Sequence, residues 1–178
     1  MRAKSWAQIT DGLRKIHEKE RELAHQSDRG LAIVGGAIVQ DALKGLLLRS
    51  FVRSSGKIRG MFEPDGALSA FASQIRLAYA LGLVSPAIYN DLELIRQIRN
   101  KAAHFIHFSQ KDSEPEELVT FQNPAIRQWS LTLTCPSAVG FKSKDSRERF
   151  KKTCEWLTDR LRFPMDDSRE LEYDDIPF

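Results

Sequence analysis

The sequence predicts an all-α fold: a single bundle of five to six helices, followed by an extended acidic C-terminal tail. Several stretches repeat apolar residues at helical spacing. The segments between them are short and rich in residues that favour turns. A chain of 178 residues, 42% of them hydrophobic, is long enough to bury one core. We therefore expect one helical domain over residues 1–164 and a flexible tail over 165–178.

The N-terminal half supplies two of the expected helices. The first is Trp6–His25, where apolar residues recur about every 3.5 positions and leave one narrow face to bury. The second is Arg29–Val52, the most apolar stretch of the chain, with Asp28 as its N-cap. Its adjacent Gly35 and Gly36 weaken a helix but permit close approach, so we expect another helix to cross there.

Two further helices follow a segment of turn-forming residues, Ser54–Gly66. The helix Leu68–Leu81 precedes Gly82, a residue that favours a helix C-terminus. The helix Pro86–Ile106 begins directly after Ser85, because serine is a good N-cap and proline suits the first helical position. We expect this helix to pack on Arg29–Val52.

The C-terminal part is less uniform. Ser109–Glu117 is acidic and polar, which indicates a loop. Farther on, an Asn-Pro pair favours a short helix over Ala125–Leu131, whereas alternating threonines favour an extended segment over Trp129–Thr134, and both remain open. Lys142–Leu161 is expected to be the last helix. Its apolar face holds Phe150, Cys154, Leu157 and Leu161. Its basic residues are expected largely outside that face: Lys144, Arg147, Arg149, Lys151 and Lys152.

Composition argues against several classes of protein. Cys135 and Cys154 form neither a metal pattern nor a disulfide framework, so we expect no metal and a reducing, cytoplasmic location. The polar N-terminal segment lacks the apolar core of a secretory signal. No apolar run reaches the length that a bilayer span needs, so we expect no membrane partner. The sequence also lacks a Gly-rich phosphate loop, and we expect no cofactor.

Charge is distributed unevenly along the chain. The tail Met165–Phe178 holds six acids and one arginine, a net charge of −5, so the remainder carries +8 of the total +3. A basic body suits an anionic partner, although such a distribution also simply favours solubility. A third possibility is an antitoxin-like or scaffold module whose acidic tail binds a basic protein.

The segment 99–104, Arg-Asn-Lys-Ala-Ala-His, carries most of the functional information. On a helix of about 100° per residue, Arg99 falls within an apolar stripe. The stripe consists of Ile88, Leu92, Ile95 and Ala102. A guanidinium there is costly unless it is paired or faces a cleft or a partner. The alternatives are an internal ion pair with Asp41 or Glu93, or a role in binding an anion.

The residue types in this segment suit RNA cleavage without a metal. Histidine titrates near neutral pH, so His104 can transfer protons. Arg99 can bind a phosphate through two N–H groups, and Asn100 can position that phosphate. Because Arg99 and His104 diverge by about 140° on one helix, we expect a homodimer to complete the site. The expected flanking contacts to nucleic acid are Arg96, Lys101 and His107. For Arg96 the alternative is a solvated pair with Glu93.

Arg99-Asn100-Lys101-Ala102-Ala103-His104 resembles the R-polar-x-x-x-H signature of the HEPN superfamily. The resemblance implies a small all-helical protein that pairs its motif helices in a dimer. It also implies a metal-independent endoribonuclease that acts as a toxin or defence effector. In that case His104 handles protons, Arg99 holds the phosphate and Asn100 positions it.

A longer stretch, residues 28–107, resembles the mannitol operon repressor (MltR-like) family. The likeness is carried by Gly66-Ala67-Leu68, Gln74–Leu83, Tyr89–Leu92 and Ile95-Arg96. This family is all-helical and is regarded as regulatory. The resemblance therefore implies the alternative function, a non-enzymatic transcriptional regulator that works through a protein partner.

Overall fold

The computed structural model describes residues 26–51, 56–104, 121–134 and 143–163. Within these ranges it contains six helices and no strand, which confirms the all-α prediction. The predicted helix Trp6–His25, the loop Ser109–Glu117 and the acidic tail lie outside the described residues.

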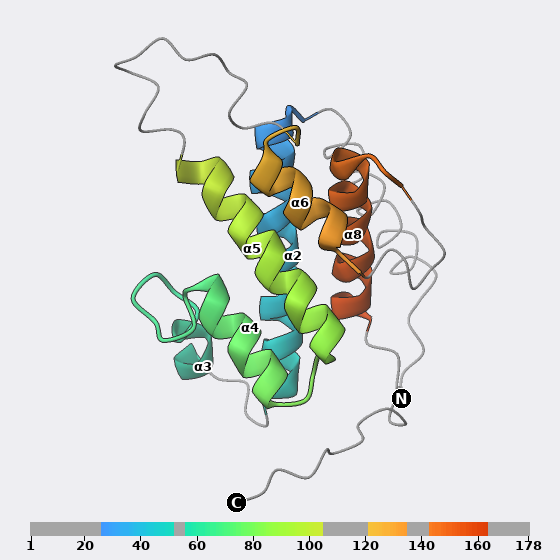
Figure 1. Cartoon of the computed structure of the whole chain (residues 1–178). Helices are drawn as coiled ribbons and strands as arrows, with labels where there is room; N and C mark the ends of the chain where they lie inside the picture. Colours follow the sequence, from blue (N-terminus) through green and yellow to red (C-terminus); the bar gives the residue numbers. More distant parts are fainter. Residues whose placement is uncertain (1–25, 52–55, 105–120, 135–142, 164–178) are drawn as a thin grey trace, which may run out of the picture.

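The central helix of the fold is α2 (Asp28–Ser50). The helices α8 (Ser146–Arg162), α5 (Pro86–His104) and α4 (Phe71–Ala80) pack against it, as Figure 1 shows. The helix α6 (Pro124–Thr132) packs on α5 and α8. The predicted packing of the Arg99 helix on the apolar N-terminal helix is therefore confirmed.

The apolar character of α2 follows from its place between three other helices. A helix that is apolar around most of its circumference must be covered on most sides. By length and composition alone, α2 is also the one described helix that could cross a membrane, which corrects the expectation that no apolar run is long enough. Half of that apolar window is buried inside the fold, and a core helix passes the same test.

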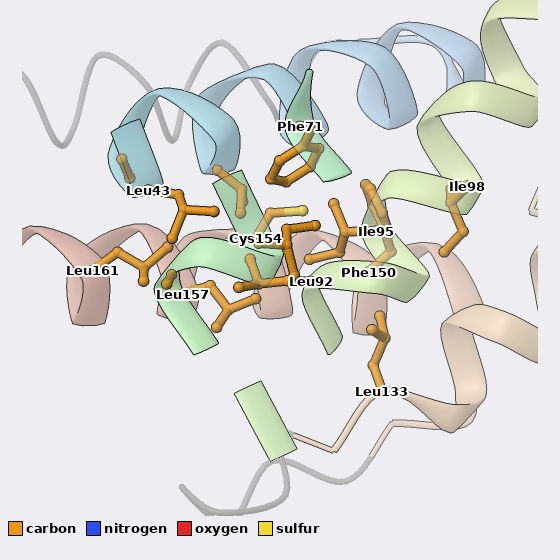
Figure 2. Close-up of a cluster of buried hydrophobic side chains, with 14 of the residues drawn as sticks. Leu43, Phe71, Leu92, Ile95, Ile98, Leu133, Phe150, Cys154, Leu157 and Leu161 are labelled. Carbon is orange, nitrogen blue, oxygen red and sulfur yellow. The ribbon is translucent and has the colours of Figure 1, made fainter. Parts of the chain in front are cut away.

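Side chains from the four longest helices and the end of α6 meet in one core (Figure 2). The predicted apolar face of α8 is confirmed, since Phe150, Cys154 and Leu157 are fully buried. On α5, Leu92, Ile95 and Ala102 are fully buried as well. At roughly 25 cal/mol per Å² of apolar surface, this burial is the main stabilising contribution to the bundle.

Gly35 shows why α2 carries a glycine pair. A Cβ added at Gly35 would lie 3.1 Å from Cε1 of Phe150 and 3.2 Å from Sγ of Cys154. Both neighbours belong to α8, so the missing side chain allows the closest contact between these two helices. The predicted helix crossing at the glycine pair is confirmed.

The turn between α4 and α5 has the capping that the sequence indicates. Gly82 adopts a φ of 66°, a left-handed conformation that favours glycine. Its N–H donates to the carbonyl of Tyr79, and the N–H of Leu83 donates to that of Ala78, which together form a Schellman motif. Ser85 Oγ accepts from the N–H of Ile88 at 3.4 Å, so α5 starts where expected.

Several predicted helix boundaries differ from those in the structure. Ser27, not Asp28, caps α2, because its Oγ accepts from the N–H of Gly30. The predicted loop after α2 contains one short helix, α3 (Gly56–Gly60). The predicted helix Leu68–Leu81 begins only at Phe71, and α8 begins after its cap Asp145 rather than at residue 142. Between the two alternatives for residues 125–134, the helix is correct.

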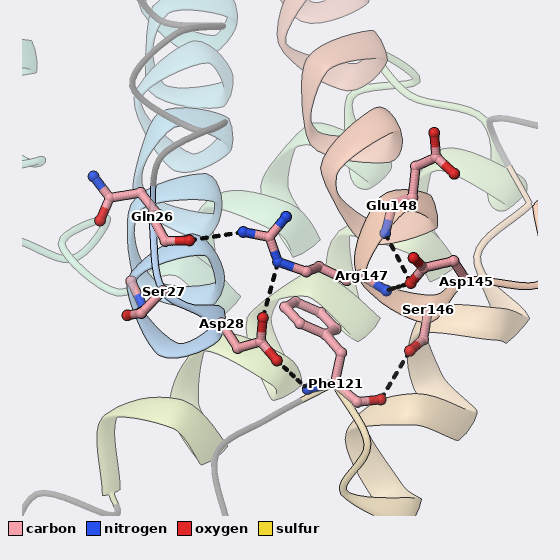
Figure 3. Close-up of polar contacts among 9 residues, drawn as sticks. Gln26, Ser27, Asp28, Phe121, Asp145, Ser146, Arg147 and Glu148 are labelled. Atoms are coloured by element: carbon pink, nitrogen blue, oxygen red, sulfur yellow. Dashed lines mark hydrogen bonds and ion pairs between the residues drawn. The ribbon is translucent and has the colours of Figure 1, made fainter. Parts of the chain in front are cut away.

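Two arginines of α8 bind other elements instead of lying outside the packing. Arg147 donates to the Asp28 carboxylate at 2.8 Å and to the Gln26 carbonyl at 2.7 Å (Figure 3). Arg149 donates to the carbonyl of Leu133, at the end of α6. Both satisfy groups at helix ends, which the spacing within α8 alone could not indicate.

Candidate functional site

Arg99 lies on the side of α5 that faces α2. The space that its side chain occupies, called here the seat of Arg99, exists because residue 36 is a glycine. A Cβ added at Gly36 would lie 2.9 Å from Cδ of Arg99 and 3.0 Å from its Cβ. The aliphatic part of the arginine therefore occupies the space that any other residue at position 36 would fill. The two adjacent glycines of α2 thus have separate partners, α8 at Gly35 and Arg99 at Gly36.

The guanidinium of Arg99 is held by an uncharged group. Its Nη1 donates to Oε1 of Gln40, one helical turn along α2 from Gly36, at 2.5 Å. Nε2 of Gln40 in turn donates to the carbonyl of Ser69 at 3.4 Å, in the segment before α4. The amide is thereby bound at both ends, and it fixes where the arginine points.

Neither of the predicted ion-pair partners binds Arg99. Asp41 is exposed, and Glu93 accepts from Arg96 at 2.9 and 2.7 Å. Among the described residues, no carboxylate lies within ion-pair distance of Arg99. Hydrogen bonding to a neutral amide satisfies one donor but leaves the full positive charge in place.

The other predicted residues are distributed along the end of α5. Asn100 is exposed, and Lys101 is half-buried and has a polar partner. Arg96 is half-buried in its pair with Glu93, as the structural alternative predicted. His104 is the last residue of α5, and its side chain, like all of His107, lies outside the described part of the chain.

Asp91 is a polar residue of α5 that sequence reasoning missed. It is fully buried, and its carboxylate accepts from the N–H of Thr134 at 2.9 and 3.0 Å and from its hydroxyl at 3.2 Å. This contact ties α5 to the end of α6 and so holds the helix that carries Arg99. The sequence did contain an indication that Asp91 is buried, since on a helical wheel it lies near the centre of the apolar face of α5.

Gln40 and Gly36 were not predicted as part of the site. Gln40 is separated from Arg99 by 59 positions, and no local pattern links them. Gly36 was expected only to permit a helix crossing. Trp129 and Trp156 are partly buried and pack against the core.

Metal and thiol chemistry find little support in the described residues. No three His, Cys, Asp or Glu side chains there are grouped so that they could hold a metal ion. Burial raises the pKa of the Cys154 thiol well above its ordinary value, with a further increase from the negative charge of Glu155. The neutral, enclosed thiol is a poor nucleophile.

The arrangement around Arg99 is suited to binding an anion. A half-buried guanidinium that is held on one side by Gln40, and that pairs with no carboxylate of the described residues, retains N–H donors for a phosphate or a carboxylate. In its neighbourhood the exposed Asn100 offers a further polar group. No protein-family model, curated protein or solved structure matches this chain.

Proposed function

We propose that this protein is an RNA-directed, HEPN-like endoribonuclease that acts as a homodimer and needs no metal. The observation that supports this most is the seat of Arg99, in which Gly36 makes room for the side chain and Gln40 orients it without neutralising it. A purely structural arginine is expected to pair with a carboxylate. The retained charge suits contact with a phosphate.

In the proposed reaction, Arg99 binds the scissile phosphate and stabilises charge that develops on it. Asn100 positions the phosphate, and His104 transfers protons between the ribose 2′-hydroxyl, the leaving 5′-oxygen and solvent. The 2′-oxygen attacks phosphorus while the bond to the 5′-oxygen breaks, so a cyclic phosphate and a free 5′-hydroxyl result. Two α5 helices meeting at a dimer axis would bring an Arg99 and a His104 to one phosphate.

The test is cleavage of RNA in EDTA by the wild type and by His104→Ala. The variant is expected to lose cleavage by a factor of roughly 100 to 10,000 while keeping its helicity and its dimer mass. His17→Ala is the matched control, since it removes a histidine outside the motif and should cut like the wild type. Equal cleavage by His104→Ala and wild type would contradict the catalytic role.

The alternative function is a non-enzymatic transcriptional regulator of the mannitol-repressor type that binds a protein. Exposed apolar side chains favour it, since Leu81 and Phe163 are each at least half exposed. It predicts no nuclease activity, and a protein partner that still binds the Arg99→Ala/His104→Ala double variant. Loss of that partner in the double variant would favour the motif-dependent function instead.

A further inference from the structure

A pair of tyrosines lies at the corner between α4 and α5. Tyr79, in the last turn of α4, and Tyr89, in the first turns of α5, have ring centroids 4.8 Å apart and an interplanar angle of 46°. Tyr79 remains 46% exposed, although it is a large aromatic residue. The turn at Gly82 brings the two rings together, so the pair is a fixed surface feature rather than a chance contact.

The carboxylates nearest to this pair on α5 already have partners: Asp91 is buried against Thr134, and Glu93, one helical turn after Tyr89, is paired with Arg96. Residues 66–90 contain no Asp or Glu, and the exposed Arg76 lies one helical turn before Tyr79. Among the described residues, no carboxylate pairs with Arg76. The charge that Arg76 adds beside the aromatic rings is therefore positive, which suits an anionic partner.

The pair also lies on the side of α5 that leads to Arg99. Tyr89 and Arg96 are seven residues apart, so their side chains leave the helix within about 20° of each other. Arg99 lies about 15 Å farther along the helix axis than Tyr89 and about 80° around it, on the side that faces α2. A strand that runs from the tyrosines along α5 would therefore pass the Arg96–Glu93 pair and turn toward α2 to reach Arg99.

Aromatic rings beside arginines are typical of surfaces that bind single-stranded nucleic acid. The rings stack on unpaired bases, and the guanidinium groups contact phosphates without reading sequence. Bases in a duplex are stacked on each other and cannot use such a platform. We propose that Tyr79 and Tyr89 stack an unpaired base of single-stranded RNA whose backbone follows α5 to Arg99. The inference rests on the proposed function and adds that the substrate is unstructured RNA.

The experiment measures the affinity of a labelled 12-nucleotide oligouridine for the full-length chain by fluorescence anisotropy at several salt concentrations. It uses the His104→Ala background so that cleavage does not consume the strand. Tyr79→Ala should weaken binding by roughly 5- to 150-fold with an unchanged dependence on salt, because stacking releases no counterions. Tyr79→Phe, which keeps the ring, should bind like the parent.

Two further variants separate stacking from charge. Arg76→Gln should weaken binding and lower the slope of log affinity against log salt by about 0.7, the value for one phosphate contact on a single strand. Phe163→Ala removes an exposed aromatic ring from the end of α8 and should leave binding unchanged. Thermal unfolding of each variant confirms that the fold is retained.

The outcomes distinguish this inference from the proposed function. If Tyr79→Ala binds like the parent, or if a duplex of equal length binds as well as the single strand, base stacking by the tyrosines is refuted and the proposed nuclease activity is unaffected. If binding depends on Tyr79 but the wild type cuts no RNA, base stacking is supported and the proposed nuclease activity is refuted. A parent chain that binds no RNA overturns both.

Discussion

Two arginines approach α2 from different helices and are held in different ways. Arg147 of α8 binds the Asp28 carboxylate at 2.8 Å and the Gln26 carbonyl, and Asp28 also accepts from the N–H of Phe121 (Figure 3). Arg99 of α5 binds only the neutral amide of Gln40 among the partners described for it. Arg147 is therefore neutralised by a carboxylate, whereas in the described ranges no carboxylate pairs with Arg99.

The contrast separates an arginine that ties parts of the fold together from one that, under the proposed function, binds a phosphate. The Arg147 cluster joins the start of α2, the segment before α6 and the start of α8, so its bonds hold three parts of the chain together. The Arg99 contact joins two helices that already pack through apolar side chains. Removing each arginine should therefore affect different properties of the protein.

The largest expected difference comes from replacing each arginine by glutamine. Arg99→Gln should lower RNA cleavage by roughly 100- to 1,000-fold, the usual cost of losing one donor to the transition state, and change stability little. Arg147→Gln should leave cleavage intact and lower the free energy of unfolding by about 1 kcal/mol, since its ion pair is partly exposed. Single-turnover cleavage and urea unfolding of both variants check this. Reversed phenotypes would refute the comparison.

A smaller effect is expected from making the Arg99 site resemble the Arg147 site. Gln40→Glu supplies a carboxylate where the amide now lies, so it should neutralise Arg99. The ion pair should contribute up to about 1 kcal/mol of stability, and the lost donor to the Ser69 carbonyl should offset part of that gain. RNA affinity should fall by about tenfold, with one fewer phosphate contact in the salt dependence. Gln128→Glu on the exposed side of α6 adds the same charge elsewhere and should change neither property. Equal losses in both variants would indicate a general charge effect.

The smallest effects concern the glycine pair. Gly35→Ala should destabilise the protein, because the new methyl meets a buried phenylalanine ring and the Cys154 sulfur, and a gain of about 1 kcal/mol in helix propensity offsets only part of the overpacking. Gly36→Ala meets Cδ of Arg99 at 2.9 Å and its Cβ at 3.0 Å, and because Cβ cannot move without α5, this variant should be destabilised as well. It should in addition lower RNA cleavage several-fold, because the atoms that it displaces belong to Arg99. A cleavage loss confined to Gly35→Ala would show that the seat of Arg99 is unimportant.

Patterns along the chain were sufficient for the features that depend on neighbours in sequence. The helical spacing of Phe150, Cys154 and Leu157 predicted the buried face of α8, and Ser85 with Pro86 predicted the start of α5. The unusual position of Arg99 was visible because one helix repeats its face every three to four residues. Periodicity reports which side of a helix is apolar, and this is a local property.

Contacts between segments that are distant in sequence could be identified only from the tertiary structure. The choice between an internal ion pair and a retained charge at Arg99 depends on Gln40, which is 59 positions away, and on the space beside Gly36. The spacing of α8 likewise suggested that Arg147 faces outward, yet the start of α2 places Asp28 beside it. Which partner a buried charge meets is set by how whole helices cross, and a pattern within one helix carries no information about that crossing.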